Sequence, residues 1–268
     1  MGTYRLTVEY DGSDFHGWQR QPQMRTAEGE LRTALSRIAH DDVAMTAAGR
    51  IDAGAHAHGQ AVGVQLSREW PADRLRLALN AVLPRDVTVS AVTTAPEGFH
   101  ARHDAVRRTY RYLVVPRRVP VARRFAWEVS GDLDLASMRH GAEVLRGRHD
   151  FAAFGSSPRP GGTTVRTIAA VIVRRVSGLG GGESFSAVVI EVTADAFLRG
   201  MMRGIAGALV ALGQGRLTVA ELAEALDGSR SRPARVTVAP ARGLHQWSVT
   251  YADAGSQDAP AAAQGVQS

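Results

Sequence analysis

The stretch that joins two predicted strands in the first half of the chain, residues 48–60, reads AGRIDAGAHAHGQ. Runs of alternating apolar residues flank it at 43–47 and 60–66, a pattern typical of strands that bury one face. Most hairpin connections need only a few residues, so about ten residues here indicate a role beyond reversing the chain. Its glycines, Gly49, Gly54 and Gly59, permit positive φ angles and close approach of a partner. We therefore expect the chemistry of the protein to lie in this loop.

The loop contains two opposite charges, Arg50 and Asp52. If the fold brings them together, the permanently charged guanidinium of Arg50 holds the Asp52 carboxylate ionised. Such a carboxylate is fit to act as a base or a nucleophile without a cofactor. The alternative is a surface loop in which an arginine and an aspartate meet by chance.

The same loop also permits a metal site. Asp52, His56 and His58 are suitable ligand types. Further ligands would come from outside the loop, namely His16, His100 and His103. Against a metal site, the chain has no Cys and no His-Glu-x-x-His motif, and a His-x-His pair in a strand shares one face by period alone.

The composition narrows the class of protein. With 268 residues, of which 44% are hydrophobic, the chain can bury one large core or two smaller ones. The absence of cysteine excludes disulfide scaffolds and thiolate metal sites, and it fits a reducing compartment. No apolar leader segment follows Met1, and the longest apolar run, 204–213, is too short to span a bilayer. We expect a cytoplasmic protein.

The basic residues are all arginines, 32 of them against 26 acids, which gives a formal net charge of +6. Eight lie between Arg102 and Arg124 with one acid, Asp104, among them. The eight are Arg102, Arg107, Arg108, Arg111, Arg117, Arg118, Arg123 and Arg124. Such a block can bind phosphates or form a solvated face. Aromatic residues interleaved with it, such as Tyr110 and Tyr112, provide stacking platforms for bases and favour a nucleic acid as partner.

Periodicity divides the chain into two halves of the same order. The first half predicts strands at 4–10, 43–47, 60–66 and 87–93 and helices at 27–38 and 75–82. The second half predicts strands at 109–115, 167–174, 184–192 and 246–251 and helices at 134–145, 198–212 and from 218 onward.

These elements predict an α+β fold. Each half has the β-α-β-β-α-β order of a ferredoxin-like unit, and the second half has an extra helix. We expect the two halves, 1–105 and 106–251, to join into one continuous, mainly antiparallel sheet with helices on one side and a catalytic cleft between the halves. Residues 252–268 lack apolar periodicity and are predicted to be a disordered tail.

Gly49-Arg50-Ile51-Asp52-Ala53-Gly54-Ala55-His56, followed by Gly59-Gln60, closely resembles the signature loop of the tRNA pseudouridine synthase A family. Further matches follow in the family's order along most of the chain, at 9–12, 17–20, 80–84, 99–112, 147–154, 166–168, 197–203 and 243–244. A single match carries little weight, but collinear matches over most of the chain are hard to explain by chance.

This resemblance implies an enzyme that isomerises uridine to pseudouridine at positions 38 to 40 of the tRNA anticodon stem-loop. It implies a homodimer whose two subunits share the tRNA, and no metal or organic cofactor. Asp52 matches the catalytic aspartate, and Arg50 matches the arginine that replaces or extrudes the target nucleotide. Tyr110 matches the tyrosine that stacks on the flipped uracil, and Arg203 matches the arginine that pairs with the carboxylate.

Other residues would bind the substrate. Leu244 matches an apolar wall of the uracil pocket. The resemblance implies that the arginine block binds tRNA phosphates, with Arg102, Arg107, Arg108 and Arg111 as substrate-binding residues. Ile51 departs from the family, which usually has a threonine there, so that a hydrogen bond of the loop must come from elsewhere.

Two other functions compete with this interpretation. A non-catalytic RNA-binding or RNA-folding protein on the same scaffold would keep the arginines and aromatic residues but would not need Asp52. A metal-dependent hydrolase through Asp52, His56 and His58 would bind a metal and lose activity with a chelator.

Overall fold

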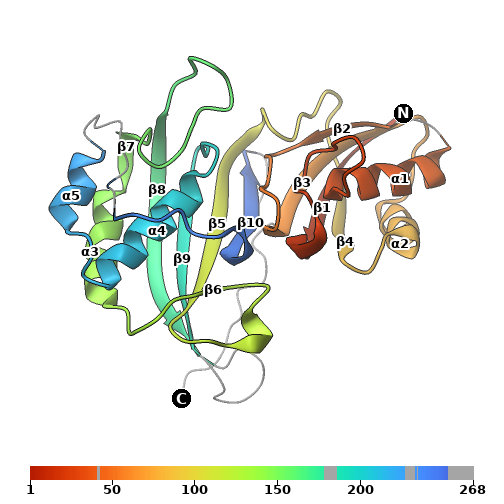
Figure 1. The fold of residues 1–268 in the computed structure, drawn as a ribbon. Helices are drawn as coiled ribbons and strands as arrows, with labels where there is room; N and C mark the ends of the chain where they lie inside the picture. Colours follow the sequence, from red (N-terminus) through yellow and green to blue (C-terminus); the bar gives the residue numbers. More distant parts are fainter. Residues whose placement is uncertain (41–42, 178–185, 227–232, 234, 253–268) are drawn as a thin grey trace, which may run out of the picture.

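A computed structural model describes residues 1–40, 43–177, 186–226, 233 and 235–252 (Figure 1). Within these residues ten strands form one sheet in the order β4-β1-β3-β10-β5-β9-β8-β7, with β2 paired to β3 and β6 paired to β5. The pairings are antiparallel except for β10 with β3 and β5 with β6. The predicted mixed fold with one mostly antiparallel sheet is confirmed.

The first half contributes one end of the sheet and two helices. Its elements are β1 (Gly2–Tyr10), α1 (Ala27–Ala39), β2 (Ala44–Ala47), β3 (His56–Leu66), α2 (Ala72–Val82) and β4 (Val87–Thr94). Every second residue of β1 is buried, as the alternation predicted. Thr26 caps α1 by accepting a hydrogen bond from the backbone N–H of Gly29, and the buried face of the helix packs into the core through Leu31 and Leu35.

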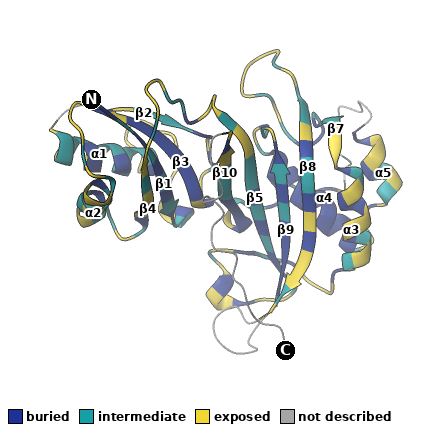
Figure 2. Ribbon diagram, turned by 180° about the vertical axis from the view of Figure 1, so that it is seen from behind, coloured by how far each residue is buried: buried dark blue, intermediate teal, exposed yellow. Residues whose placement is uncertain are grey.

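The described residues of the second half contribute the other end of the sheet and the α-helices α3, α4 and α5. Its elements are β5 (Ala105–Val115), β6 (Trp127–Glu128), α3 (Leu135–Val144), β7 (Gly147–Asp150), β8 (Val165–Val176), β9 (Ala187–Ala194), α4 (Met201–Gly213), α5 (Val219–Glu224) and β10 (Leu244–Tyr251). In Figure 1 α4 crosses in front of β8 and β9, with α3 beside it, and in the view from behind these strands lie in front of α4 (Figure 2). Twelve residues of α4 are buried, which makes it the central helix of this half.

The two halves meet where β10 runs parallel to the start of β3. Two residue pairs form this junction, His245 with His56 and Gln246 with Ala57. On its other edge β10 pairs along its length with β5. Since Asp52 lies only four residues before His56, the junction places the predicted catalytic loop between the halves.

Several elements differ from the sequence prediction. The strand β3 begins at His56 rather than at 60, because β10 pairs with residues that the local pattern assigned to the loop. The helix α4 begins at Met201 rather than at 198, after Gly200 with a φ of 75°. The short strand β7 was not predicted at all. Residues 178–185, which include the start of the strand predicted at 184–192, and residues 253–268 of the predicted tail lie outside the described part of the chain.

Among the described residues, no helix combines the length and the apolar character needed to cross a bilayer.

Candidate active site

A cleft of about 710 Å³ lies between the two halves and is lined by residues of both. The first half contributes Arg50 and Asp52 from the loop that precedes β3. The second half contributes Tyr110 from β5, Arg203 from α4 and Leu244 from the start of β10. The cleft therefore brings together the five residues to which the resemblance assigned the main roles.

The backbone of the loop is held by hydrogen bonds to the segment that follows β1. The N–H of Trp18 donates to the carbonyl of Ile51 at 3.1 Å, and the N–H of Gly54 donates to the carbonyl of Phe15 at 3.3 Å. Within the loop itself, the N–H of Ala55 donates to the carbonyl of Asp52 at 3.1 Å. Gly54, inside this turn, has a φ of 76°, which a residue with a Cβ rarely adopts. These contacts fix the turn that carries the Asp52 carboxylate.

Asp52 forms an ion pair with Arg203. Nη1 of Arg203 donates to Oδ2 of Asp52 at 2.9 Å, and Nε of Arg203 donates to the carbonyl of Ala239 at 2.7 Å. The Asp52 and Arg203 side chains are 29% and 27% exposed, so the pair faces the cleft. Among the described residues, Oδ1 of Asp52 accepts no hydrogen bond from a protein group. The arrangement holds the carboxylate in one orientation and leaves one oxygen for a substrate.

The phenol ring of Tyr110 forms a wall of the cleft. Its ring packs edge-on against Phe197, with centroids 4.7 Å apart and planes at 68°. Burial raises the pKa of Tyr110 to about 12, and the nearby charge of Asp52 acts in the same direction. Tyr110 therefore stays neutral at physiological pH and presents an aromatic surface and a hydroxyl group rather than a charge.

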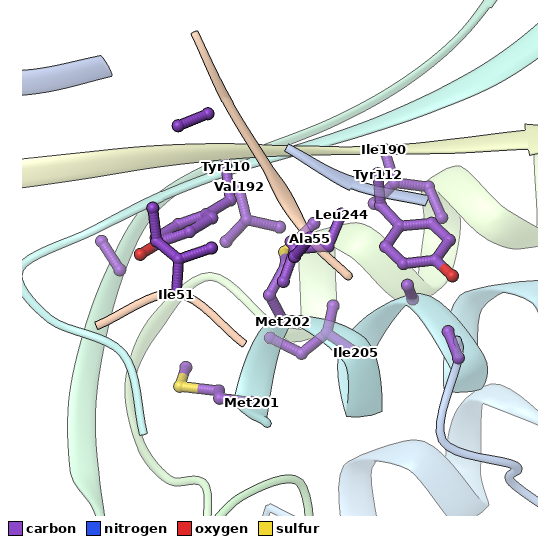
Figure 3. Packing of buried hydrophobic residues seen from close by; sticks show 14 of the residues in the cluster. Ile51, Ala55, Tyr110, Tyr112, Ile190, Val192, Met201, Met202, Ile205 and Leu244 are labelled. Carbon is purple, nitrogen blue, oxygen red and sulfur yellow. The ribbon is translucent and has the colours of Figure 1, made fainter. Parts of the chain in front are cut away.

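Apolar side chains close the cleft around the ion pair. Ile51, Met202 and Leu244 are buried, and Figure 3 shows Ile51 close to Tyr110 and Met202 close to Leu244. The cleft therefore offers apolar walls beside the Asp52–Arg203 pair, a combination typical of sites that bind small molecules. Ile51, which departs from the family pattern, contributes its side chain to the core and its carbonyl to the bond with Trp18.

The predicted arginines do not share one surface. Arg50 and Arg102 are exposed and line the cleft. Arg50 forms no ion pair among the described residues, so the partner of Asp52 is Arg203 and not, as the first hypothesis had it, Arg50. Arg108 also lines the cleft, but its guanidinium donates to backbone carbonyls.

Arg107 and Arg111 are not among the residues that line the cleft. Arg111 pairs with Glu191 and lies over the ring of Trp247 at 3.6 Å. Because it alternates with Tyr110 along β5, its side chain leaves the opposite face of the sheet.

His56 and His58, the two loop histidines of the metal hypothesis, contact protein groups. Nδ1 of His56 accepts from the N–H of Gly12 at 3.1 Å, and its Nε2 lies 2.9 Å from the carbonyl of Arg124. His56 stacks on His245 with ring centroids 4.7 Å apart, and His58 contacts His245 at 3.2 Å. In the described part of the chain no three His, Cys, Asp or Glu side chains are grouped as metal ligands.

Sequence reasoning missed a residue that supports the loop. Gln60, fully buried in β3, donates from Nε2 to the carbonyl of Gly49 at 2.7 Å, at the point where the loop begins. The available signal was a glutamine directly before an apolar run of the strand, since a buried amide needs a partner. Phe197, which packs edge-on against Tyr110, lay in a matched segment without an assigned role.

Two comparisons of the sequence with known proteins agree on one family. A model of a family described as tRNA pseudouridine synthase matches residues 6–104 and 142–252, more than half of the chain. A protein of Methylobacterium sp. (strain 4-46) named tRNA pseudouridine synthase A is 41% identical over 258 residues, which cover 95% of this chain and 100% of the relative.

A protein of the same name from Chlorobium phaeovibrioides is 37% identical and covers 94% of this chain and 100% of its own length. Among solved structures, the crystal structure of an archaeal box H/ACA sRNP Nop10-Cbf5 complex matches with a TM-score of 0.35 and 10% identity. This match covers 89% of this chain and 58% of the other.

Proposed function

Because this chain belongs to the tRNA pseudouridine synthase family, we propose that it isomerises uridine to pseudouridine at positions 38, 39 and 40 of the tRNA anticodon stem-loop. In this reaction the bond between the ribose and a ring nitrogen of uracil breaks, and a ring carbon then joins the ribose. The observation that carries the proposal is the ion pair of Asp52 with Arg203, whose two residues line a cleft of about 710 Å³ between the halves.

Asp52 acts on the ribose of the target nucleotide. Its free oxygen either takes a proton from the sugar or attacks it covalently, and either role suits a fixed carboxylate in a partly enclosed site. Arg203 holds the other oxygen of Asp52 and so prevents the carboxylate from rotating away.

The base is bound by the rings and aliphatic groups around the carboxylate. Tyr110 stacks on the uracil, and Leu244 covers its edge, a combination supported by their burial on the cleft wall. Arg50, which is exposed and lines the cleft, takes the place of the target nucleotide when that nucleotide leaves its stem. Neither step requires a metal or an organic cofactor.

The exposed arginines are the side chains available to bind tRNA phosphates. Arg102, at the cleft, is the best placed of the four that the resemblance assigns to substrate binding. Arg107 and Arg111 would have to contact tRNA outside the cleft, and Arg108 is already engaged with carbonyls.

The two halves, 1–105 and 106–251, are inferred to be copies of one ferredoxin-like unit. Supporting this, β4-β1-β3-β2 in the first half and β10-β5-β9-β8 in the second have equivalent orders along the sheet. We further infer a cytoplasmic homodimer in which tRNA spans both subunits. A light-scattering mass of twice 28.6 kDa would support the dimer, and a mass of 28.6 kDa at micromolar concentration would refute it.

The test is pseudouridine formation in an unmodified anticodon stem-loop with EDTA present, comparing the protein with its Asp52→Asn variant. We expect product at positions 38 to 40 from the parent and none from the variant, with equal RNA affinity. Binding without product from the parent would instead favour a non-catalytic tRNA-binding protein. Activity that returns only with added metal would revive the metal hypothesis.

A further inference from the structure

The guanidinium of Arg108 is surrounded by four backbone carbonyls. Nη1 donates to the carbonyls of Ala105 at 3.0 Å and Asp195 at 2.8 Å. Nη2 donates to the carbonyls of Ala48 at 3.3 Å and Arg102 at 2.6 Å. A planar guanidinium carries N–H groups that point in several directions from one centre, so one side chain can reach all four.

Two of these carbonyls mark the points where the catalytic segments leave the sheet. Ala48 follows the last residue of β2, and the next four residues lead directly to Asp52. Asp195 follows the last residue of β9, and the chain then passes through Phe197 to the helix that carries Arg203. Arg108 therefore connects the starting points of the two segments whose ends form the Asp52–Arg203 ion pair.

The second of these points is itself fixed to the sheet. The backbone N–H of Asp195 donates to the carbonyl of Thr167 at 3.1 Å, and Oδ1 of Asp195 accepts from the N–H of Thr167 at 3.1 Å. The same oxygen accepts from the N–H of Ala196 at 2.6 Å. Arg108 thus holds the beginning of the Asp52 loop against a turn that cannot move independently of β8.

We propose that Arg108 is a positioning residue that sets the geometry of the Asp52–Arg203 pair through these carbonyls, rather than a contact for tRNA phosphate. The kinetic test of this inference rests on the proposed function, because it measures pseudouridine formation. A lysine at this position keeps the charge that a phosphate needs, but its single ammonium group cannot reproduce the spread of a guanidinium. The two roles therefore predict opposite results for one substitution.

The experiment compares Arg108→Lys with the parent in single-turnover pseudouridine formation at saturating stem-loop RNA and in RNA binding at two salt concentrations. We expect the single-turnover rate to fall at least tenfold, while Kd changes less than threefold and its salt dependence is unchanged. A lysine variant with the parent's rate overturns the proposal. So does a rate loss that disappears when the RNA concentration is raised.

The matched control is Arg139→Lys, because Arg139 also donates to a backbone carbonyl, that of Val173 at 3.1 Å, but does not line the cleft. It should retain the parent's rate. If Arg108→Lys does not fold, Arg108→Gln, whose amide keeps two donors, should retain more of the rate than Arg108→Ala. Equal losses in the glutamine and alanine variants would contradict the proposal.

Amide hydrogen exchange tests the role of Arg108 in holding the two catalytic segments and needs no catalytic activity. If the parent protein proved inactive, the proposed function would be refuted, but the exchange experiment would still decide the role of Arg108. In Arg108→Lys we expect faster amide exchange in residues 48–55 and 195–203 and unchanged exchange in α1. Unchanged exchange in both catalytic segments would show that Arg108 does not hold them.

Discussion

Nη1 of Arg203 lies 2.9 Å from Oδ2 of Asp52, although the two residues are 151 positions apart in the sequence. One stands on the loop before β3 and the other in the first turn of α4, so the ion pair bridges the two halves of the protein. The backbone around it is fixed independently on each side, through Ile51 on the loop and Ala239 beside the helix. Activity should therefore depend on both halves keeping their relative position.

Replacing Arg203 should reduce activity more than stability. In Arg203→Ala we expect the single-turnover rate to fall at least about a hundredfold, because Asp52 loses the group that orients it. The pair is partly exposed, so the free energy of unfolding should fall by only about 1 kcal/mol. Rates and urea unfolding, measured side by side, separate the two effects.

Arg203→Lys should recover only part of that rate, because an ammonium group cannot contact Asp52 and the carbonyl of Ala239 in the same planar geometry. An alanine variant with the rate of the parent would show that orientation of Asp52 by this contact is not needed.

Tyr110 should contribute mainly through its ring. Tyr110→Phe keeps the edge-on contact with Phe197, and we expect its rate to stay within about tenfold of the parent. Tyr110→Leu removes the aromatic surface that we propose stacks on uracil. Such stacking is worth about 1–3 kcal/mol, so the rate or affinity should fall by roughly 5- to 150-fold. Both variants are measured for Kd and for single-turnover rate. Equal losses in the two variants would point to the hydroxyl group instead of the ring.

The stacked histidines at the junction of β3 and β10 predict an acid-sensitive stability. Burial, followed by the neighbouring His56, lowers the pKa of His245 to about 3. Its Nε2 donates to the carbonyl of Phe125 at 2.8 Å, which leaves Nδ1 to accept from His58 in the neutral form. In the unfolded chain the imidazole of His245 binds a second proton near pH 6.5. The stabilisation that the neutral, buried His245 contributes is therefore complete above that pH and is lost as the pH falls toward 3.

We therefore expect the free energy of unfolding to fall between pH 6.5 and 4 with a contribution from His245 of up to about 1.4 kcal/mol per pH unit. Urea unfolding at several pH values measures this slope. In His245→Gln, which does not titrate, the slope should be shallower by that amount. Parallel slopes in the parent and the variant would show that His245 is not responsible.

Local pattern predicted most of the elements, because apolar alternation and helical spacing depend on neighbouring residues. The same pattern also predicts the face of the sheet on which Arg111 lies, since a residue between Tyr110 and Tyr112 in a strand must point to the opposite face. The pairing of β10 with His56 could not be read in this way, because it joins residues nearly two hundred positions apart. The same holds for the carbonyls around Arg108, which no side-chain pattern reveals.

Residues 237–239 pack closely across α4 at Gly207, and this contact leads to one more prediction. We call them the crossing segment. A Cβ on Gly207 would lie 1.9 Å from the carbonyl oxygen of Thr237, a backbone atom that cannot rotate away. Gly207→Ala must therefore push the crossing segment outward, and we expect a loss of at least about 2 kcal/mol in the free energy of unfolding. The same segment carries the carbonyl of Ala239, which binds Arg203, so the rate should fall in the protein that remains folded.

Gly213→Ala on the same helix is the matched control, because its Cβ would meet the flexible side chain of Met138 at 2.9 Å, and we expect a change within about 1 kcal/mol. Thermal unfolding and single-turnover rates of the two variants show whether the losses are specific to alanine at Gly207 or arise from alanine anywhere on α4. If both glycines tolerate alanine equally, the crossing segment is free to move. Arg203 would then have to be held by α4 alone, without its contact to Ala239.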